Sequence, residues 1–103
     1  MAADEIHVGD IGTVITLDFY DGAATVDISA ATVAQMIFEA PDGTAAAVAA
    51  TLGPANYQMH YHTLAGTFDE AGEWSKQGYV EFGGGTSAWH SDVHPFTVFP
   101  NLI

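Results

Sequence analysis

The sequence predicts an all-β protein that folds as a single β-sandwich. Apolar and polar side chains alternate along several short segments, which is the pattern of strands with one buried and one solvated face. Turn signals separate these segments: Asp21-Gly22, Pro41-Asp42-Gly43, Gly53-Pro54 and Gly83-Gly84-Gly85. The chain has 103 residues, 49% of them hydrophobic, which is enough for one core and one domain. About seven antiparallel strands at this spacing are typical of an immunoglobulin-like sandwich.

The first half of the chain is expected to hold an arm and five strands. Residues 1–10 carry acids and no sustained periodicity, so they are predicted to form a loosely held N-terminal arm, with the sandwich domain at residues 11–103. The strands are predicted at residues 11–20, 25–28, 32–39, 44–52 and 57–63. In the first strand the face predicted to be buried carries Ile11, Thr13, Ile15, Leu17 and Phe19. The fourth strand is rich in alanine, which favours a helix, but its place between Pro-Asp-Gly and Gly-Pro favours a strand.

A corner and the strand after it organise the second half. The run Asp69-Glu70-Ala71-Gly72 can turn tightly, because glycine accepts a positive φ and the acids can bond to turn amides. Trp74 then begins a strand at residues 74–82 and is predicted to be a core side chain. Lys76 falls on the same apolar face, so we expect its methylenes along the edge of the core and its ammonium at the rim.

A last strand is predicted at residues 87–99. Trp89 and Val93 are expected to point inward, and Pro95 indicates an edge strand or a bulge, because proline cannot donate to the ladder. The sequence contains no internal repeat and no linker, so a single domain is expected.

The charge balance argues against several kinds of partner. One cation, Lys76, opposes 13 Asp and Glu, for a formal net charge of −12. Nucleic-acid affinity rests largely on Lys and Arg that neutralise phosphates, so we expect no direct nucleic-acid binding and no binding to an anionic membrane. The absence of cysteine rules out disulfides and thiolate metal sites. The acidic N-terminus lacks the features of a secretory signal, so synthesis in the cytoplasm is expected.

Four histidines raise the question of a metal site. His60 and His62, and separately His90 and His94, could each place imidazoles on one face of a strand at a spacing that can chelate. In a seven-stranded sandwich, however, the two strands usually belong to different sheets. No metal site is therefore predicted; solvated histidines are favoured, and contacts between subunits are the alternative.

The acids of the corner could also carry chemistry. Asp69, Glu70 and Glu73 could serve as paired carboxylates for acid–base catalysis or as ligands for Ca²⁺. A polar corner is favoured, because catalysis also needs a pocket and a second group of functional residues. The sequence contains no Ser-His-Asp signature, Walker loop or dinucleotide fingerprint. We therefore expect no enzymatic activity, no catalytic residues and no cofactor.

The order of the motifs resembles a known group of proteins. It consists of Ile11-Gly12-Thr13, Val26-Asp27-Ile28-Ser29, Phe38-Glu39-Ala40-Pro41-Asp42-Gly43-Thr44, Gly72-Glu73-Trp74 and Phe96-Thr97-Val98. In this respect the chain is similar to the small immunoglobulin-like virion proteins of tailed bacteriophages, which are related to the N-terminal domain of baseplate upper proteins. The likeness extends from about Gly9 to Leu102, although Lys76 stands where an aliphatic residue would be expected.

The resemblance implies a structural role in the virion. Domains of this group dock onto other virion proteins, so the implied partners are the major capsid, tail or baseplate proteins, and the implied place is the virion. The chain ends without the downstream coil or fibre of the longer baseplate proteins, which favours a stand-alone accessory protein in many copies. The roles considered are decoration, cement and adaptor, and copies could also associate with one another within the particle.

Two surfaces are candidates for binding. The C-terminal segment from Phe96 is apolar, and Phe99, Leu102 and Ile103 are the candidate partner-binding residues; the alternative is that they complete the domain's own core. The second hypothesis is a carbohydrate-binding module that attaches to a cell-surface glycan. In that case sugar rings would stack on Trp89, Tyr79, Tyr57 and Tyr61.

Overall fold

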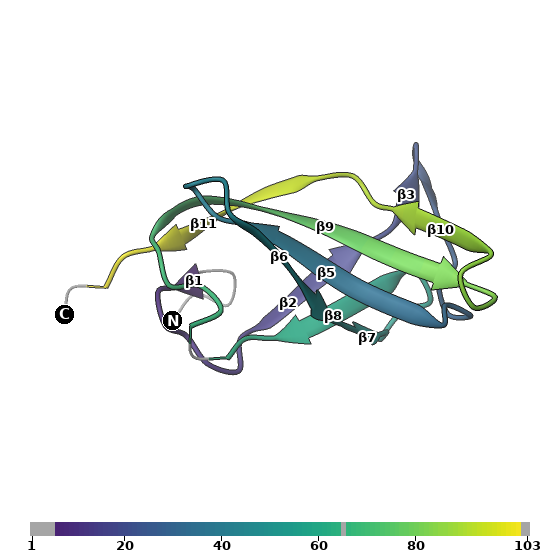
Figure 1. Ribbon diagram of the computed structural model, residues 1–103, viewed down its shortest axis with the longest axis horizontal. Helices are drawn as coiled ribbons and strands as arrows, with labels where there is room; N and C mark the ends of the chain where they lie inside the picture. Colours follow the sequence, from purple (N-terminus) through teal and green to yellow (C-terminus); the bar gives the residue numbers. More distant parts are fainter. Residues whose placement is uncertain (1–5, 65, 102–103) are drawn as a thin grey trace.

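The computed structural model describes residues 6–64 and 66–101, and in these residues strands and turns form two packed sheets without any helix (Figure 1). The large sheet has the order β1-β11-β9-β5-β6, and β10 pairs with the second half of β9. Its strands are β1 (Ile6–His7), β5 (Val33–Glu39), β6 (Ala45–Ala49), β9 (Gly72–Phe82), β10 (Ser87–His90) and β11 (His94–Phe99). Its pairs are antiparallel except that of β1 with β11, which is parallel.

The small sheet has the order β2-β8-β7 and consists of β2 (Val14–Asp18), β7 (Thr51–Leu52) and β8 (Gln58–His62). A short hairpin of β3 (Tyr20–Asp21) and β4 (Ala24–Thr25) follows β2. Only Ala50 separates β6 from β7. One segment of chain therefore begins in the large sheet and ends in the small one, which joins the two sheets along that side.

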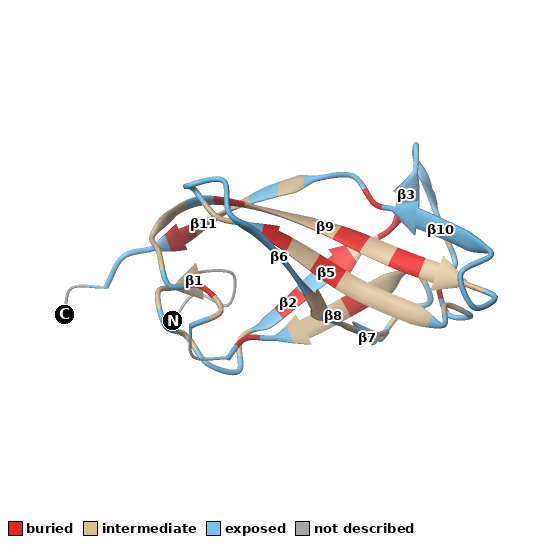
Figure 2. Cartoon of the chain, in the orientation of Figure 1, coloured by how far each residue is buried: buried red, intermediate tan, exposed pale blue. Residues whose placement is uncertain are grey.

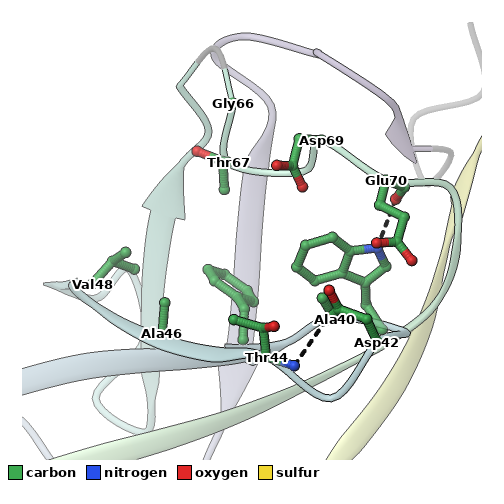
Figure 3. Close-up of a pocket in the computed structure, with 11 residues that line it drawn as sticks. Ala40, Asp42, Thr44, Ala46, Val48, Gly66, Thr67, Asp69 and Glu70 are labelled. Atoms are coloured by element: carbon green, nitrogen blue, oxygen red, sulfur yellow. Dashed lines mark hydrogen bonds between the residues drawn. The ribbon is translucent and has the colours of Figure 1, made fainter.

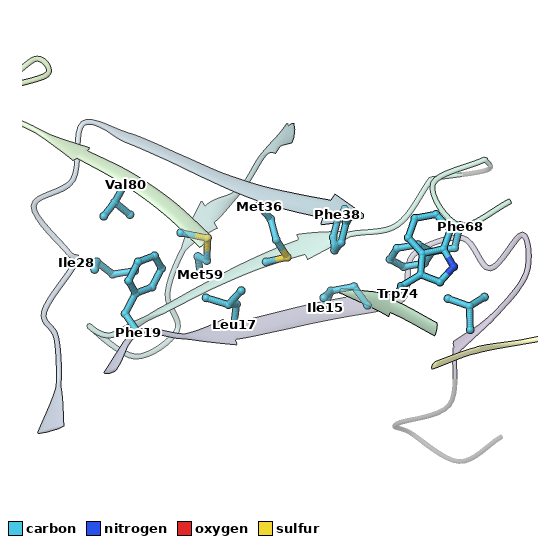
Figure 4. Packing of buried hydrophobic residues seen from close by; sticks show 11 residues of the cluster. Ile15, Leu17, Phe19, Ile28, Met36, Phe38, Met59, Phe68, Trp74 and Val80 are labelled. Atoms are coloured by element: carbon cyan, nitrogen blue, oxygen red, sulfur yellow. The ribbon is translucent and has the colours of Figure 1, made fainter. Parts of the chain in front are cut away.

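The inner faces of the two sheets meet in one hydrophobic core (Figures 2 and 4). Its buried members are Ile15, Leu17, Phe19, Ile28, Met36, Phe38, Met59, Phe68, Trp74, Val80 and Val98. In β2 the buried side chains alternate with exposed ones, as expected for residues that face opposite sides of a strand. Burying a side chain of this size contributes about 1.5 to 3 kcal/mol, so this cluster supplies most of the driving force for folding.

The indole of Trp74 fixes the corner before β9. Its Nε1 donates a hydrogen bond of 2.9 Å to the backbone oxygen of Glu70, within the turn itself. The ring packs edge-on against Phe68, with 5.0 Å between the ring centroids. A buried tryptophan needs a partner for its N–H, and this bond supplies one while it holds the corner against the core. The prediction that Trp74 is a core residue is confirmed.

Gly78 allows the two sheets to approach closely in the middle of β9. A Cβ at this position would lie 2.5 Å from the ring of Phe19 and 2.9 Å from the side chain of Leu17. A side chain there would have to displace Leu17 of β2 and Phe19, which follows β2. Glycine inside a strand often marks a close approach of this kind.

Several predicted strands are confirmed by the structure. The strands at residues 32–39, 57–63 and 74–82 correspond to β5, β8 and β9. The segment 44–52 is extended, as predicted, although it is divided between the two sheets as β6 and β7. The Pro-Asp-Gly turn joins β5 to β6 as an antiparallel hairpin, with Gly43 at a φ of 89°.

The prediction of one last strand at residues 87–99 is wrong, because this segment forms two strands, β10 and β11, along different halves of β9. At the break, Ser91 exchanges hydrogen bonds with the backbone of Gly78. The expected burial of Trp89 and Val93 is also wrong, since they are 48% and 58% exposed. Trp89 pairs with buried Val80, but it lies on an edge strand, where a side chain has core neighbours on one flank only.

The start of the chain also differs from the expectation. Residues 1–5 of the predicted arm lie outside the described residues, but Ile6–His7 pair with β11 as β1. The N–H of Val8 donates to the oxygen of Phe99 at 3.1 Å. Ile11 was expected to face inward but is 70% exposed. The strand predicted at residues 25–28 is wrong in its extent, because only Thr25 of these residues lies in a strand, at the end of β4 (Ala24–Thr25).

Candidate functional site

The edge strand β6 has one side that faces no other strand. In the described part of the chain, β6 pairs only with β5 (Figure 1). This ladder is flanked by hydrogen bonds of 3.0 Å from Ala50 N–H to Ala34 O and 2.8 Å from Ala40 N–H to Thr44 O. Antiparallel ladders alternate between hydrogen-bonded and non-bonded pairs, so the even-numbered residues bond to β5. The backbone groups of Ala45, Ala47 and Ala49 therefore point away from the sheet.

The composition of β6 does not protect this edge. Its sequence is Ala-Ala-Ala-Val-Ala, without the charged side chains or prolines that usually prevent edge strands from pairing with other chains. Methyl side chains also leave room for a second backbone to approach. The edge is thus able to accept an additional strand.

A pocket of about 390 Å³ opens beside β6, on the inner face of the large sheet (Figure 3). Its apolar part is formed by Phe38, Ala40, Ala46, Val48 and Trp74. Ala46 and Val48 pair with Phe38 and Met36 of β5, so they point to the same side of the sheet as these buried residues. The pocket is therefore an uncovered continuation of the hydrophobic core along the free edge.

Three carboxylates surround this apolar surface. Asp42 comes from the turn between β5 and β6, and Asp69 and Glu70 come from the corner before β9 (Figure 3). The N–H of Thr44 donates to Asp42 Oδ1 at 2.9 Å, and this hydrogen bond lowers the pKa of the Asp42 carboxyl. No Lys, Arg or His is among the described residues that line the pocket. The combination suits an apolar side chain flanked by positive charge.

The structure separates the three acids of the predicted corner. Asp69 and Glu70 line the pocket, whereas Glu73 is exposed on β9. Glu73 accepts a hydrogen bond from the hydroxyl of Thr97 on the neighbouring β11. The side chains thus do not meet as one carboxylate cluster.

The edge strand β2 of the small sheet has the same length as β6 but a different environment. Thr63 N–H donates to Thr13 O at 2.9 Å, so the odd-numbered residues bond to β8. The residues that face the edge are Val14, Thr16 and Asp18. Lys76 of the large sheet donates from its Nζ to Thr16 O at 2.8 Å. The middle carbonyl of the β2 edge is thereby occupied by a charged side chain.

Lys76 is partly withdrawn from solvent in this position. Burial lowers the pKa of its ammonium, and the charge of Asp18 partly offsets that effect. Its Nζ lies 6.0 Å from the centre of the Phe96 ring. The predicted placement of Lys76, with its stem along the core and its ammonium at the rim, is confirmed. Since it is the chain's only Lys or Arg, the described surface presents carboxylates without an exposed cation of these types.

Of the predicted partner-binding residues, only Phe99 can be placed. It is 38% exposed at the end of β11, and its ring lies 5.8 Å from that of His7. Its neighbour Val98 is buried in the core. Leu102 and Ile103 lie outside the described residues. β9 and β5 separate the strand of Phe99 from β6, so Phe99 does not belong to the pocket or the β6 edge.

The four aromatic residues considered for sugar binding do not share one surface. Tyr61 packs against Phe38, with 5.8 Å between ring centroids, on the inner side of the sandwich. The hydroxyl of Tyr79 donates to Glu81 Oε2 at 2.6 Å, and this bond raises the pKa of Tyr79. Tyr79 pairs with Gln35 rather than with a core residue, which places it on the outer face of the large sheet.

Trp89 lies at a second hollow, which the sequence did not indicate. This cavity of about 280 Å³ is lined by Phe19, Tyr20, Asp21, Val26, Trp89 and His90. Tyr20 is 43% exposed, and its ring centroid lies 6.2 Å from that of Tyr57. Two of the four predicted residues are therefore near this hollow, together with Tyr20, which was not predicted.

The histidine pairs lie in different sheets, as predicted. His60 and His62 belong to β8, whereas His90 and His94 belong to β10 and β11. The rings of His60 and His62 are 5.6 Å apart, and Nδ1 of His60 lies 2.8 Å from Gly53 O. Among the described residues, no group of three or more His, Cys, Asp or Glu is placed to hold a metal ion.

Sequence reasoning did not identify the β6 edge or its pocket as a site. The signal was nevertheless present: a strand without a charged residue, bounded by Pro-Asp-Gly and Gly-Pro, in a chain that is otherwise strongly acidic. The pattern does not show which strand lies at the edge of a sheet, because the order of the strands depends on pairing between distant segments.

Comparisons with family models, with curated proteins and with solved structures found no match. No helix long and apolar enough to cross a membrane occurs in the described residues. The function must therefore be argued from the geometry and charge of the chain itself.

Proposed function

We propose that the chain is a non-enzymatic structural protein of a tailed-bacteriophage virion. It docks in multiple copies on a more basic capsid, tail or baseplate protein and acts there as a decoration, cement or adaptor component. The observation that carries the proposal is the distribution of charge. Thirteen carboxylates oppose one lysine, and the ammonium of that lysine is engaged with the backbone oxygen of Thr16 at the rim of the sandwich.

This charge distribution favours association with a different protein. Copies of a strongly acidic domain repel one another, whereas a partner rich in Lys and Arg attracts it. Attraction between exposed charges is screened beyond about 8 Å at physiological ionic strength, so it speeds capture more than it prolongs residence. Apolar contacts must hold the docked complex, and the pocket at Phe38 and Trp74 offers such a surface.

The order of the strands supports an immunoglobulin-like version of the sandwich. In such domains the penultimate strand lies between the last strand and a strand from the middle of the chain, and this sheet packs on a second one. Here β9 lies between β11 and β5, and β2-β8-β7 form the opposing sheet. This order agrees with the resemblance to the virion proteins, which rests on short motifs in the same segments.

The proposal is tested by the composition of purified particles. In a culture that produces both the chain and tailed phage, particles purified on a density gradient are expected to contain many copies of the chain, as quantified by mass spectrometry. Particles stripped of the chain are then reloaded with it. Reloading in about 1 M salt, where the Debye length falls to about 3 Å, is expected to be slower than reloading at physiological ionic strength. A chain that is abundant in the lysate but missing from the particles would contradict the virion role.

A second candidate function is binding of a cell-surface glycan, and the hollow beside Trp89 favours it. Half-exposed Trp89 and Tyr20 lie there with the polar side chains of Asp21 and His90, a combination that suits the faces and hydroxyls of a sugar. A glycan array probed with the parent and with Trp89→Ala separates the two candidates. Binding that is lost in Trp89→Ala supports the glycan role, and no binding by the parent removes it.

A further inference from the structure

We infer that β6 is a docking edge, which an extended basic segment of a partner protein joins as an additional strand while one of its apolar side chains enters the pocket at Phe38 and Trp74. The inference rests on the proposed function, because it names the contact through which the acidic domain would hold its partner. It assigns a role to a strand that neither the motifs nor the charge pattern had singled out.

The backbone of β6 is the first feature that points to an added strand. Ala45, Ala47 and Ala49 direct three N–H and three C=O groups away from β5, and within the described residues no strand pairs with that side of β6. An extended segment can satisfy these groups by β-augmentation, in which main-chain hydrogen bonds give affinity and neighbouring pockets give specificity. The edge strand carries no charged side chain, so nothing on β6 itself opposes this pairing.

The side chains of the added segment would alternate between the two faces of the sheet. Successive residues of a strand point to opposite faces of a sheet, so every second residue of the segment would face the same side as Ala46 and Val48. That side holds the pocket of about 390 Å³, with aromatic rings in its wall. One large apolar side chain can therefore enter the pocket while the backbone pairs with β6.

The charge around the pocket selects the kind of partner. Asp42, Asp69 and Glu70 lie around the pocket, and the pocket lining contains no cation among the described residues. A second copy of this chain would bring another −12 formal charges and a β6 without a lysine or arginine to face these acids. A segment with a lysine or arginine two residues from its apolar residue would place both side chains on the pocket side, where the positive charge would pair favourably with the same acids. A basic segment is therefore the occupant that the site fits.

The experiment uses the full chain and a defined probe. The probe is an acetylated ten-residue peptide in which threonine alternates with lysine, with one central lysine replaced by phenylalanine, so that the phenylalanine and its flanking lysines face the pocket side together. Binding is measured by calorimetry for the parent, for Ala47→Pro and for Thr16→Pro. Both substitutions remove an N–H that faces a sheet edge, a place where proline is tolerated, so Thr16→Pro is the matched control on β2.

We expect the parent to bind the peptide, Ala47→Pro to bind at least about tenfold more weakly, and Thr16→Pro to bind within about twofold of the parent. Melting by circular dichroism checks that both variants are folded. If either variant is not folded, two methylated forms of the peptide are tested on the parent protein. One form is N-methylated at the odd-numbered residues and the other at the even-numbered residues, and the form whose methyl groups face β6 cannot donate hydrogen bonds to it. Equal binding of the parent peptide and both methylated forms would overturn the inference.

Four further outcomes also test the docking edge or the virion role. No binding of the peptide to the parent overturns the inference, and so does self-association of the parent through β6 in sedimentation, which would make a second copy the occupant. If the chain is present in particles but Ala47→Pro loads as well as the parent, the virion role stands and the docking edge is wrong. If the chain is missing from particles, the proposed function fails whatever the peptide does.

Discussion

The two edge strands β2 and β6 each have five residues, and in each strand the backbone groups of three residues face away from the sheet. The strands differ in what contacts these groups. At β2, the ammonium of Lys76 donates to the central carbonyl, Thr16 O. At β6, the corresponding groups of Ala45, Ala47 and Ala49 have no strand beside them in the described residues. A single side chain from the opposite sheet thus distinguishes an occupied edge from an available one.

The difference also explains an apparent anomaly of the sequence. A lysine on an apolar face is costly, because burial disfavours its charged form, as the lowered pKa of Lys76 indicates. At the edge of β2 the same charge makes a hydrogen bond and discourages pairing with a foreign strand. The chain's only cation is therefore placed where it blocks an edge, and the edge without it lies beside an acidic, apolar pocket.

The largest effect is expected for Trp74→Ala, which removes the wall shared by the core and the β6 pocket. We expect the free energy of unfolding to fall by about 3 to 5 kcal/mol, because a buried ring that packs on Phe68 and bonds to Glu70 O is lost. Chemical denaturation measures this loss. Trp74→Phe is the control and should lose less, since it keeps a ring; a melting temperature of Trp74→Ala close to that of the parent would show that the wall is not part of the core.

The next largest effect is expected for Gly78→Ala on β9, at the place where the large sheet packs against Leu17 of β2 and Phe19. The added Cβ would meet the ring of Phe19 at 2.5 Å, so we expect a loss of about 1 to 3 kcal/mol from overpacking. Ala88→Gly, at an exposed position of the neighbouring β10, is a control for changes of strand propensity. A Gly78→Ala variant as stable as the parent would mean that the sheets are not closely packed beneath β2.

The core, unlike the edges, was largely predictable from the sequence. Alternation alone identified Ile15, Leu17 and Phe19 as one buried face, and the corner before β9 identified Trp74. These are local patterns, fixed by a strand period of two and by turn residues. Trp89 and Val93 were misplaced for a different reason: their burial depends on what covers the far half of β9, which no local pattern reports.

A direct test of the edge comparison is Lys76→Met, which keeps an apolar stem and removes the donor to Thr16. Unfolding free energy at neutral pH should change by no more than about 1 kcal/mol, because the lost hydrogen bond is offset by relief from burying a charge. The basic peptide should now also protect amides of β2. Unchanged protection there would show that Lys76 does not control the edge.

The same variant gives a pH signature. Burial lowers the pKa of Lys76 below its ordinary 10.5, so in the window between the lowered value and 10.5 the unfolded chain binds more protons than the folded one. Stability of the parent therefore gains a contribution as pH rises through this window. Lys76→Met should lack that gain when the free energies of unfolding of the two proteins are plotted against pH. If the two plots have the same slope in this window, the placement of the ammonium is contradicted.

The smallest effect is expected at the turn that leads into β6. The hydrogen bonds from Thr44 lower the pKa of Asp42, so the stabilisation they give is present above pH 3.8 and is lost as pH falls through the lowered value. Asp42→Asn can keep the turn but cannot titrate, so its stability should decline less on acidification. Thermal melts of both proteins between pH 5 and about pH 2 measure the difference in slope, and equal slopes would contradict the role of this bond.

The candidate site itself was beyond the reach of the sequence. Its parts come from three separate segments: the turn at Asp42, the strand β6 and the corner at Glu70. Each had been assigned its local structure, yet their meeting depends on the register of β5 with β6 and with β9. The apolar character of the C-terminal segment instead indicates Phe99, Leu102 and Ile103, and of these only Phe99 lies in the described structure.

Amide hydrogen exchange, followed residue by residue with and without the basic peptide, tests the central claim most directly. The claim is that β6 is the available edge and β2 the occupied one. The account predicts that the peptide slows exchange at Ala45, Ala47 and Ala49 and leaves Val14, Thr16 and Asp18 unchanged. Slower exchange at the β2 residues, or equal protection of the two edges, would contradict it.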